Sequence, residues 1–185
     1  KLFEDATMKN RFHRDESVTK KMKLAKEKMP SLGKIPAGLV LTTFHDSMPS
    51  HDRWLNDDEV WPKESDRWLS DTFLLPRLPL KYDAWGIRDS WHAPVLIRMA
   101  ADITLESGTR QFLLRARGLS RLWVDEKLVA RTESSKGSPS GEEPITPVVE
   151  PPRPGLRRPS YRQQEVFGDA TIGPDGQCRV VLECI

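Results

Sequence analysis

The chain has 185 residues, which is enough for one domain with a sizeable hydrophobic core and short for two. Its 29 lysines and arginines nearly balance its 27 aspartates and glutamates, so net charge gives no reason to expect nucleic acid as a partner. No apolar run approaches the roughly 20 residues that a membrane span needs. The chain begins at Lys1 and stops inside an apolar alternation, so we expect a piece of a longer protein with one principal domain.

Residues 1–34 are predicted to form a basic helical extension or linker, with ten basic and five acidic side chains. Its apolar residues recur at spacings of four, three and four, and a proline then ends the pattern. These residues are Val18, Met22, Ala25, Met29 and Pro30. The stripe predicts contact with a neighbouring part of the parent protein.

After residue 34 the pattern becomes that of short strands. Residues 39–44 are rich in apolar and β-branched types, which favours a first strand. Residues 45–94 contain five prolines and predict only short strands and loops. Residues 95–103 alternate cleanly, with the polar Arg98 and Asp102 on the second face.

The next strands are predicted around two turns. Residues 106–108 are expected to turn the chain into a strand over 111–117. The segment 120–130 predicts a hairpin that turns at Asp125-Glu126-Lys127, with Leu122 and Val124 on one strand face. The other face then carries Arg121, Trp123 and Asp125.

The last third contains a predicted loop and a predicted hairpin. Residues 133–160 are rich in serine, glycine and proline and predict a long surface loop. The turn Gly173–Gly176 lies between two alternating runs and predicts a second hairpin. Cys178 and Cys184 share one face of the final strand, too far apart to form a disulfide with each other, and buried thiols are expected.

Many short strands with proline-rich connections, and one helix confined to the N-terminus, predict a mainly β fold: an antiparallel β-sandwich over residues 35–185 with an N-terminal helical extension. A doubly wound α/β fold would need helices between the strands.

Residues 101–130 resemble the protective-antigen-type (PA-fourteen) domain, a β-sandwich of toxins, adhesins and glycosidase inserts. The likeness rests on a serine-glycine turn, a strand that begins with an aromatic residue, and an arginine-leucine-tryptophan-hydrophobic-aspartate strand with its hairpin. The matching residues are Ser107, Gly108, Phe112, Leu114, Arg121, Leu122, Trp123, Val124, Asp125, Lys127, Leu128 and Val129. The resemblance implies a non-catalytic accessory domain that binds carbohydrate outside the cytoplasm, in the periplasm or as part of a secreted protein.

Two departures from that family limit what carries over. Members that bind sugar through calcium have adjacent aspartates before the tryptophan strand, where this chain has Arg117 and Gly118. Calcium prefers oxygen ligands, usually including carboxylates, so Arg117 and Gly118 disfavour calcium without excluding it, and no other cofactor is predicted. Glu126 also replaces the glycine that is usual in the hairpin.

A second stretch, residues 25–41, is similar to connecting segments in large exported planctomycete multidomain proteins. The chain has no CxxCH haem motif, so this likeness bears only on the parent protein.

Five of the six tryptophans lie in the acidic segment 45–91. An exposed indole offers a flat apolar face to a sugar ring, and nearby carboxylates accept hydrogen bonds from its hydroxyl groups. The residues predicted to contact such a ligand are Trp85, Trp91, Asp57, Asp58 and Asp125.

Two other functions stay open. A structural spacer would dock onto flanking domains through its basic helix and proline-rich segment. Part of a hydrolase would use the two His-Asp pairs within residues 45–52, although no third ligand stands at a recognised spacing. The expected partner is a glycan or a neighbouring protein domain, and no catalytic residue or metal ligand is predicted.

Overall fold

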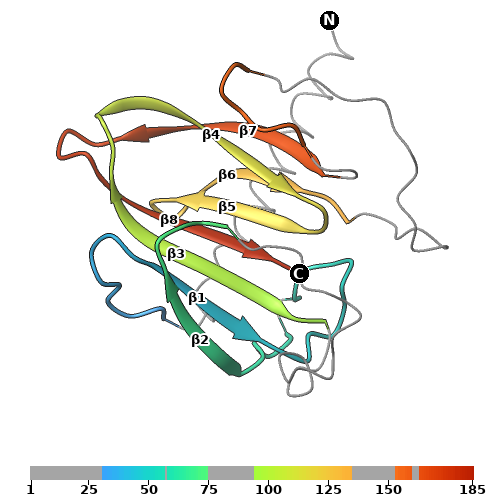
Figure 1. The fold of residues 1–185 in the computed structure, drawn as a ribbon. Coiled ribbons are helices and arrows are strands. Elements are labelled where there is room, and N and C mark those ends of the chain that lie inside the picture. Colours follow the sequence, from blue (N-terminus) through green and yellow to red (C-terminus); the bar gives the residue numbers. More distant parts are fainter. Residues whose placement is uncertain (1–30, 57, 75–93, 135–152, 160–162) are drawn as a thin grey trace, which may run out of the picture. The chain divides into compact units, whose positions relative to one another are not determined.

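The computed structural model describes residues 31–56, 58–74, 94–134, 153–159 and 163–185 (Figure 1). The described residues form eight β-strands. The predicted helix within residues 1–34 lies outside the described residues, apart from the last few positions of that range, which are not helical. In the described ranges, no helix is long and apolar enough to cross a membrane.

The chain divides into two compact units. One consists of residues 1–32 and Leu55–Trp61, and the other of Gly33–Trp54 and Pro62–Ile185. All strands belong to the second unit, which is described below.

The strands form two antiparallel sheets, so the fold of the described residues is mainly β. The larger sheet has six strands in the order β2-β1-β3-β8-β5-β6, and the smaller one pairs β4 with β7. The bounds are β1 Val40–His45, β2 Glu64–Ser70, β3 Leu96–Thr104, β4 Gly108–Ala116, β5 Ser120–Val124, β6 Lys127–Thr132, β7 Gln164–Ile172 and β8 Gln177–Cys184.

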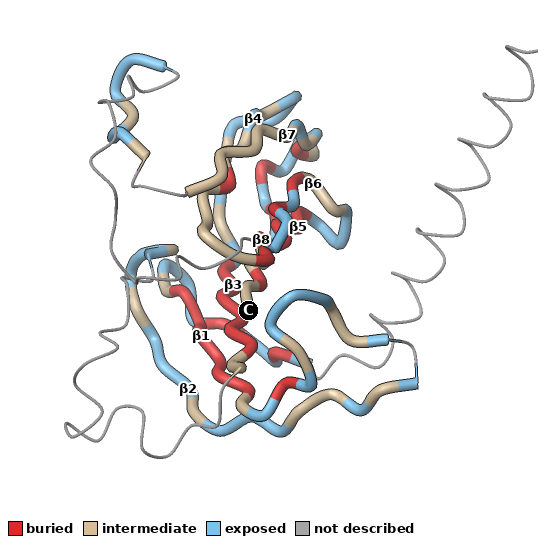
Figure 2. Tube along the Cα trace, turned by 90° about the vertical axis from the view of Figure 1, so that its right-hand side faces the viewer, coloured by how far each residue is buried: buried red, intermediate tan, exposed pale blue. Residues whose placement is uncertain are grey.

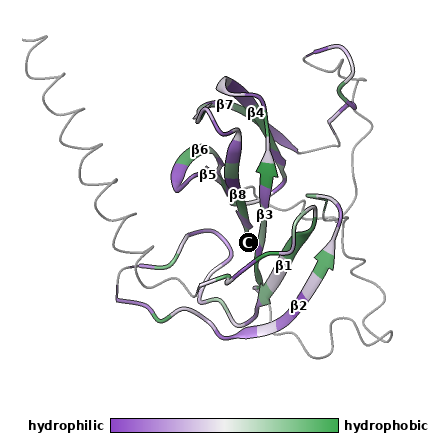
Figure 3. Cartoon of the chain, turned by 90° about the vertical axis from the view of Figure 1, so that its left-hand side faces the viewer, coloured by the Kyte–Doolittle hydropathy of each residue, from purple (hydrophilic) through white to green (hydrophobic). Residues whose placement is uncertain are grey.

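The strand predictions over 39–44, 95–103, 111–117 and the hairpin 120–130 are confirmed within a few residues. β2 is the strand whose position the alternation did not indicate. Its sequence, ESDRWLS, is polar over most of its length because it is an edge strand, and hydrophilic colours dominate it in Figure 3.

A hydrophobic cluster joins the two sheets. The smaller sheet contributes Leu114 and Ile172, and the larger contributes residues of β5, β6 and β8. These are Leu122, Val124, Ala130, Cys178 and Val180. Because each strand turns its apolar phase towards the other sheet, the layers share one core. Both cysteines are free. Cys178 is buried in this cluster, as expected, whereas Cys184 is only partly buried.

The prediction of a hairpin at Gly173–Gly176 is wrong in one respect. The turn forms, with the Gly176 N–H donating to the Gly173 carbonyl at 3.0 Å, but β7 pairs with β4 while β8 pairs with β3 and β5. The turn therefore carries the chain from one sheet to the other, because both edges of β8 are already occupied.

The connection from β3 to β4 also changes sheets. The two crossovers meet, since the Leu105 N–H donates to the Gly176 carbonyl at 2.9 Å. Gly176 has a φ of 70°, and a Cβ there would lie 2.5 Å from the Leu105 carbonyl oxygen, so glycine is required at this contact.

The face of the larger sheet that points away from the smaller one is also buried over β1, the first part of β3, β5 and the end of β8. β1 and β5 are buried at every residue, whereas β2 is mostly exposed (Figure 2). The sequence predicted a polar second face for β3, yet Arg98 is only 4% exposed. A sheet buried on both faces must hold its polar side chains in internal contacts.

Candidate functional site

A row of polar residues crosses the buried second face of the larger sheet. The register pairs Thr43 with Arg98, Arg98 with Glu183, and Glu183 with Arg121. Directly opposite residues in antiparallel strands point to the same face, so β1, β3, β8 and β5 each place one polar side chain in this row.

Glu183 is the centre of the row and has no exposed surface. Its Oε2 accepts a hydrogen bond from the Trp123 indole N–H at 3.1 Å and lies 3.0 Å from a terminal guanidinium nitrogen of Arg121. Its Oε1 lies 3.3 Å from Nε of Arg98. One carboxylate thus balances the charge of two buried arginines.

Aromatic rings flank Arg121. Its guanidinium carbon lies 3.6 Å from the centre of the Trp54 ring and 5.5 Å from that of Trp123. Trp54 lies in the connection between β1 and β2, so the stacking holds this part of the connection against the sheet face. Burial lowers the pKa of both Arg98 and Arg121, and the Glu183 charge opposes this shift.

His45 ends β1 and is 1% exposed. Its Nδ1 lies 3.0 Å from the Pro62 carbonyl oxygen, and its Nε2 lies 3.1 Å from Oγ1 of Thr43. A carbonyl only accepts, so Nδ1 carries the proton, and in the neutral ring Nε2 accepts from the Thr43 hydroxyl. Burial lowers the pKa of His45, and nearby Arg98 acts in the same direction.

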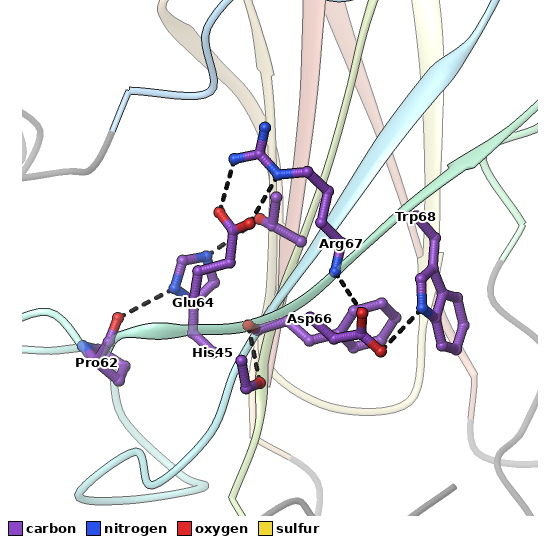
Figure 4. Close-up of polar contacts among 9 residues, drawn as sticks. His45, Pro62, Glu64, Asp66, Arg67 and Trp68 are labelled. Carbon is purple, nitrogen blue, oxygen red and sulfur yellow. Dashed lines mark hydrogen bonds and ion pairs between the residues drawn. The ribbon is translucent and has the colours of Figure 1, made fainter.

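A register shift between Phe44 and His45 alters the neighbouring edge strand β2. Asp66 pairs with Phe44, but Glu64, two positions earlier, pairs with the next residue, His45. The shift places Glu64 and Arg67 on one face, where two hydrogen bonds of 2.7 and 2.8 Å join them (Figure 4).

The opposite face of β2 carries the most exposed aromatic residue on the described strands. Trp68 is 42% exposed, and its ring centre lies 4.4 Å from that of the fully buried Phe44. The indole N–H donates to Oδ2 of Asp66 at 2.9 Å, while Oδ1 of Asp66 accepts from the Arg67 backbone N–H (Figure 4). Two contacts therefore fix an indole that still presents a large part of its surface to solvent.

The structure places two of the five predicted ligand residues. Asp58 is exposed within Leu55–Trp61. Asp125 is exposed in the β5–β6 turn, where its Oδ1 accepts from the Arg179 backbone N–H at 2.8 Å and its own N–H donates to the Arg179 carbonyl. Asp57, Trp85 and Trp91 lie outside the described residues.

The His-Asp segment 45–52 does not bring its two histidines into one environment. His45 is buried against Pro62, whereas His51 is exposed. Within the described ranges, no group of three or more histidine, cysteine, aspartate or glutamate side chains has an arrangement that would hold a metal ion.

Sequence reasoning did not select the Trp68–Asp66 pair or the Glu183 row. A signal for the row was present, since Arg98, Arg121 and Glu183 each lie on the more polar face of a strand whose other face is mostly apolar. Whether these side chains lie next to one another depends on the order of the strands in the sheet, and alternation along the sequence does not predict that order.

Comparisons with known proteins give little further. No protein-family model and no curated protein matches the chain. Among solved structures, the chain is similar to the crystal structure of a beta-glucosidase from Kluyveromyces marxianus in complex with glucose. The TM-score is 0.44 and the identity 11%, over 78% of this chain but only 14% of that enzyme.

Proposed function

We propose that this chain is a non-catalytic β-sandwich module of the protective-antigen type, which binds a glycan for a larger exported protein. The observation that carries this proposal is Trp68, an exposed indole fixed by Phe44 and Asp66 on the edge strand β2.

A fixed, exposed indole suits a sugar ring for two reasons. The apolar C–H face of a pyranose packs on the ring, and little side-chain entropy is lost because the indole is already ordered. The Asp66 carboxylate beside it has acceptor capacity for hydroxyl groups in addition to its two present hydrogen bonds. The predicted residues Trp85, Trp91, Asp57, Asp58 and Asp125 remain candidates for further contacts.

The test is a glycan array with the 185-residue chain, run with and without calcium, followed by calorimetry of the strongest ligand in the same two conditions. Trp68→Ala is expected to weaken binding by roughly 30-fold, since truncating a central tryptophan costs about 2 kcal/mol. Leu69→Ala is the matched control, because Leu69 is 53% exposed on the opposite face of the same strand, and it should leave affinity unchanged.

Each outcome bears on the proposal. An array that stays silent in both calcium conditions removes glycan binding and leaves the spacer function. Glycan binding that survives Trp68→Ala overturns the role of Trp68. Loss of binding in Leu69→Ala as well would indicate a general disturbance of β2 rather than a stacking contact.

A further inference from the structure

We propose that His45 is an acid-sensitive latch: its neutral ring ties the start of β2 to the end of β1, and its protonated ring releases that attachment. The latch acts on the attachment of one strand to the sheet and requires no ligand.

The His45 ring lies where it can join β1 to the residues just before β2. His45 lies at the register shift, where the pairing of β1 with β2 is least regular. Its Nδ1–H holds the carbonyl of Pro62, which lies two residues before β2 begins. This side-chain contact connects the approach to β2 with β1.

The surroundings of Nε2 disfavour a second proton on the His45 ring. Protonation of Nε2 turns an acceptor into a donor facing Oγ1 of Thr43, whose own proton then needs another acceptor at a site with no exposed surface. The new charge would also be buried, near the guanidinium of Arg98 on β3. Both effects favour the neutral ring.

Two carboxylates lie near the ring, Glu64 on β2 and Glu183 on β8, and both already interact with arginines. Glu64 accepts two hydrogen bonds from Arg67, and Glu183 lies between Arg98 and Arg121. Hydrogen bonding to Arg67 also lowers the pKa of Glu64, so it stays ionised in mild acid. Each carboxylate already contacts a guanidinium group. The protonated ring must therefore compete with an arginine for a carboxylate, or move out of its buried position.

The pH window follows from the lowered pKa of His45. The released ring has its ordinary pKa of about 6.5, so opening takes up a proton below that pH. The latch is fully effective above about pH 6.5 and weakens as pH falls towards the folded-state pKa. Inside that window each pH unit increases the opening equilibrium by up to about tenfold.

The test is hydrogen exchange of the 185-residue chain between pH 7.5 and 5, corrected for the intrinsic pH dependence and read by mass spectrometry on β2 and β8. Opening of β2 should cost less free energy than opening of β8. The population of chains with β2 open should increase as pH falls. His45→Asn keeps a donor near the Nδ1 position but cannot be protonated, so its β2 exchange should not change with pH. His51→Asn makes the same substitution at an exposed histidine and should behave as the wild type.

The latch is overturned if His45→Asn retains the wild-type pH dependence, or if β2 and β8 open with the same free energy at every pH. If His45→Asn does not fold, imidazole nitrogen NMR on the wild type decides. The latch requires an Nδ1–H tautomer at pH 7.5 and a titration midpoint below 6.5, with β2 exchange rising as pH falls from about 6.5 towards that midpoint. Another tautomer, or a midpoint at or above 6.5, contradicts it.

Discussion

Glu183 illustrates how a single residue holds together the part of the larger sheet that is buried on both faces. Its carboxylate contacts Arg98, Arg121 and Trp123, from the two strands on either side of β8. A buried ion pair need not stabilise a protein relative to an apolar core, but removal of one partner leaves a charge that water cannot reach. Here two arginines would lose their counter-charge together.

We predict that Glu183→Gln lowers the free energy of unfolding by about 3–5 kcal/mol, as measured by urea titration at pH 7.5. The control is Asp102→Asn. Asp102 forms a cross-strand pair with Arg179, but those two side chains are 42% and 44% exposed, so the loss should stay below about 1 kcal/mol. Equal losses in the two variants would contradict the central role assigned to Glu183.

At the scale of elements, the close approach of β7 and β6 depends on one glycine. Gly168 lies in β7, and a Cβ added there would overlap the backbone carbonyl of Val129 on β6. Backbone atoms cannot move aside as the end of a flexible side chain can. Gly168 therefore allows the smaller sheet to pack directly on the larger one.

We predict that Gly168→Ala lowers the free energy of unfolding by about 1–3 kcal/mol, because the strands must separate to admit the methyl group. Gly173→Ala is the matched control. A Cβ there would lie 3.2 Å from Oδ1 of Asp175, the end of a side chain that can rotate, so a small effect is expected. Thermal melts of the two variants compare them directly, and a larger loss from Gly173→Ala would reverse this explanation.

The sequence predicted the elements better than their partners. Alternation located most of the strands and the apolar faces of β3, β4 and β5, because burial on one face leaves a period of two. It gave the wrong partner for β8, since a tight turn between two strands fits either a hairpin or a crossover between sheets. It also missed β2, whose Trp68 is the centre of the candidate site.

At the scale of the whole molecule, β8 links the two hydrophobic clusters. Cys178, near one end of β8, lies in the cluster that both sheets share, and Cys184, at its other end, packs against the cluster around Phe44. Burial raises the pKa of both thiols, to about 12 for Cys184. A thiol becomes reactive as its thiolate, so the buried Cys178 reports on the intactness of the core.

We predict that a disulfide reagent at pH 8 modifies Cys178 roughly a thousandfold more slowly in the native chain than in urea, because reaction of this buried thiol requires opening of the core. The measurement is stopped-flow absorbance, with Cys184→Ser and Cys178→Ser separating the two sites. Fast modification of Cys178 in native buffer would show that the shared cluster opens easily.

The contact between Glu133 and Gln164 has a consequence for how this protein can change over evolution. The Gln164 side-chain amide accepts from the Glu133 N–H at 3.0 Å and donates to its carbonyl at 2.6 Å. These two hydrogen bonds hold together the end of β6 and the start of β7, independently of the length of the chain between them. Each doubling of the number of residues in such a connection costs only about 0.6 kcal/mol in closure entropy. Insertions, deletions or a grafted peptide in the interval 134–163 should therefore cost little stability, so relatives are expected to differ in length there.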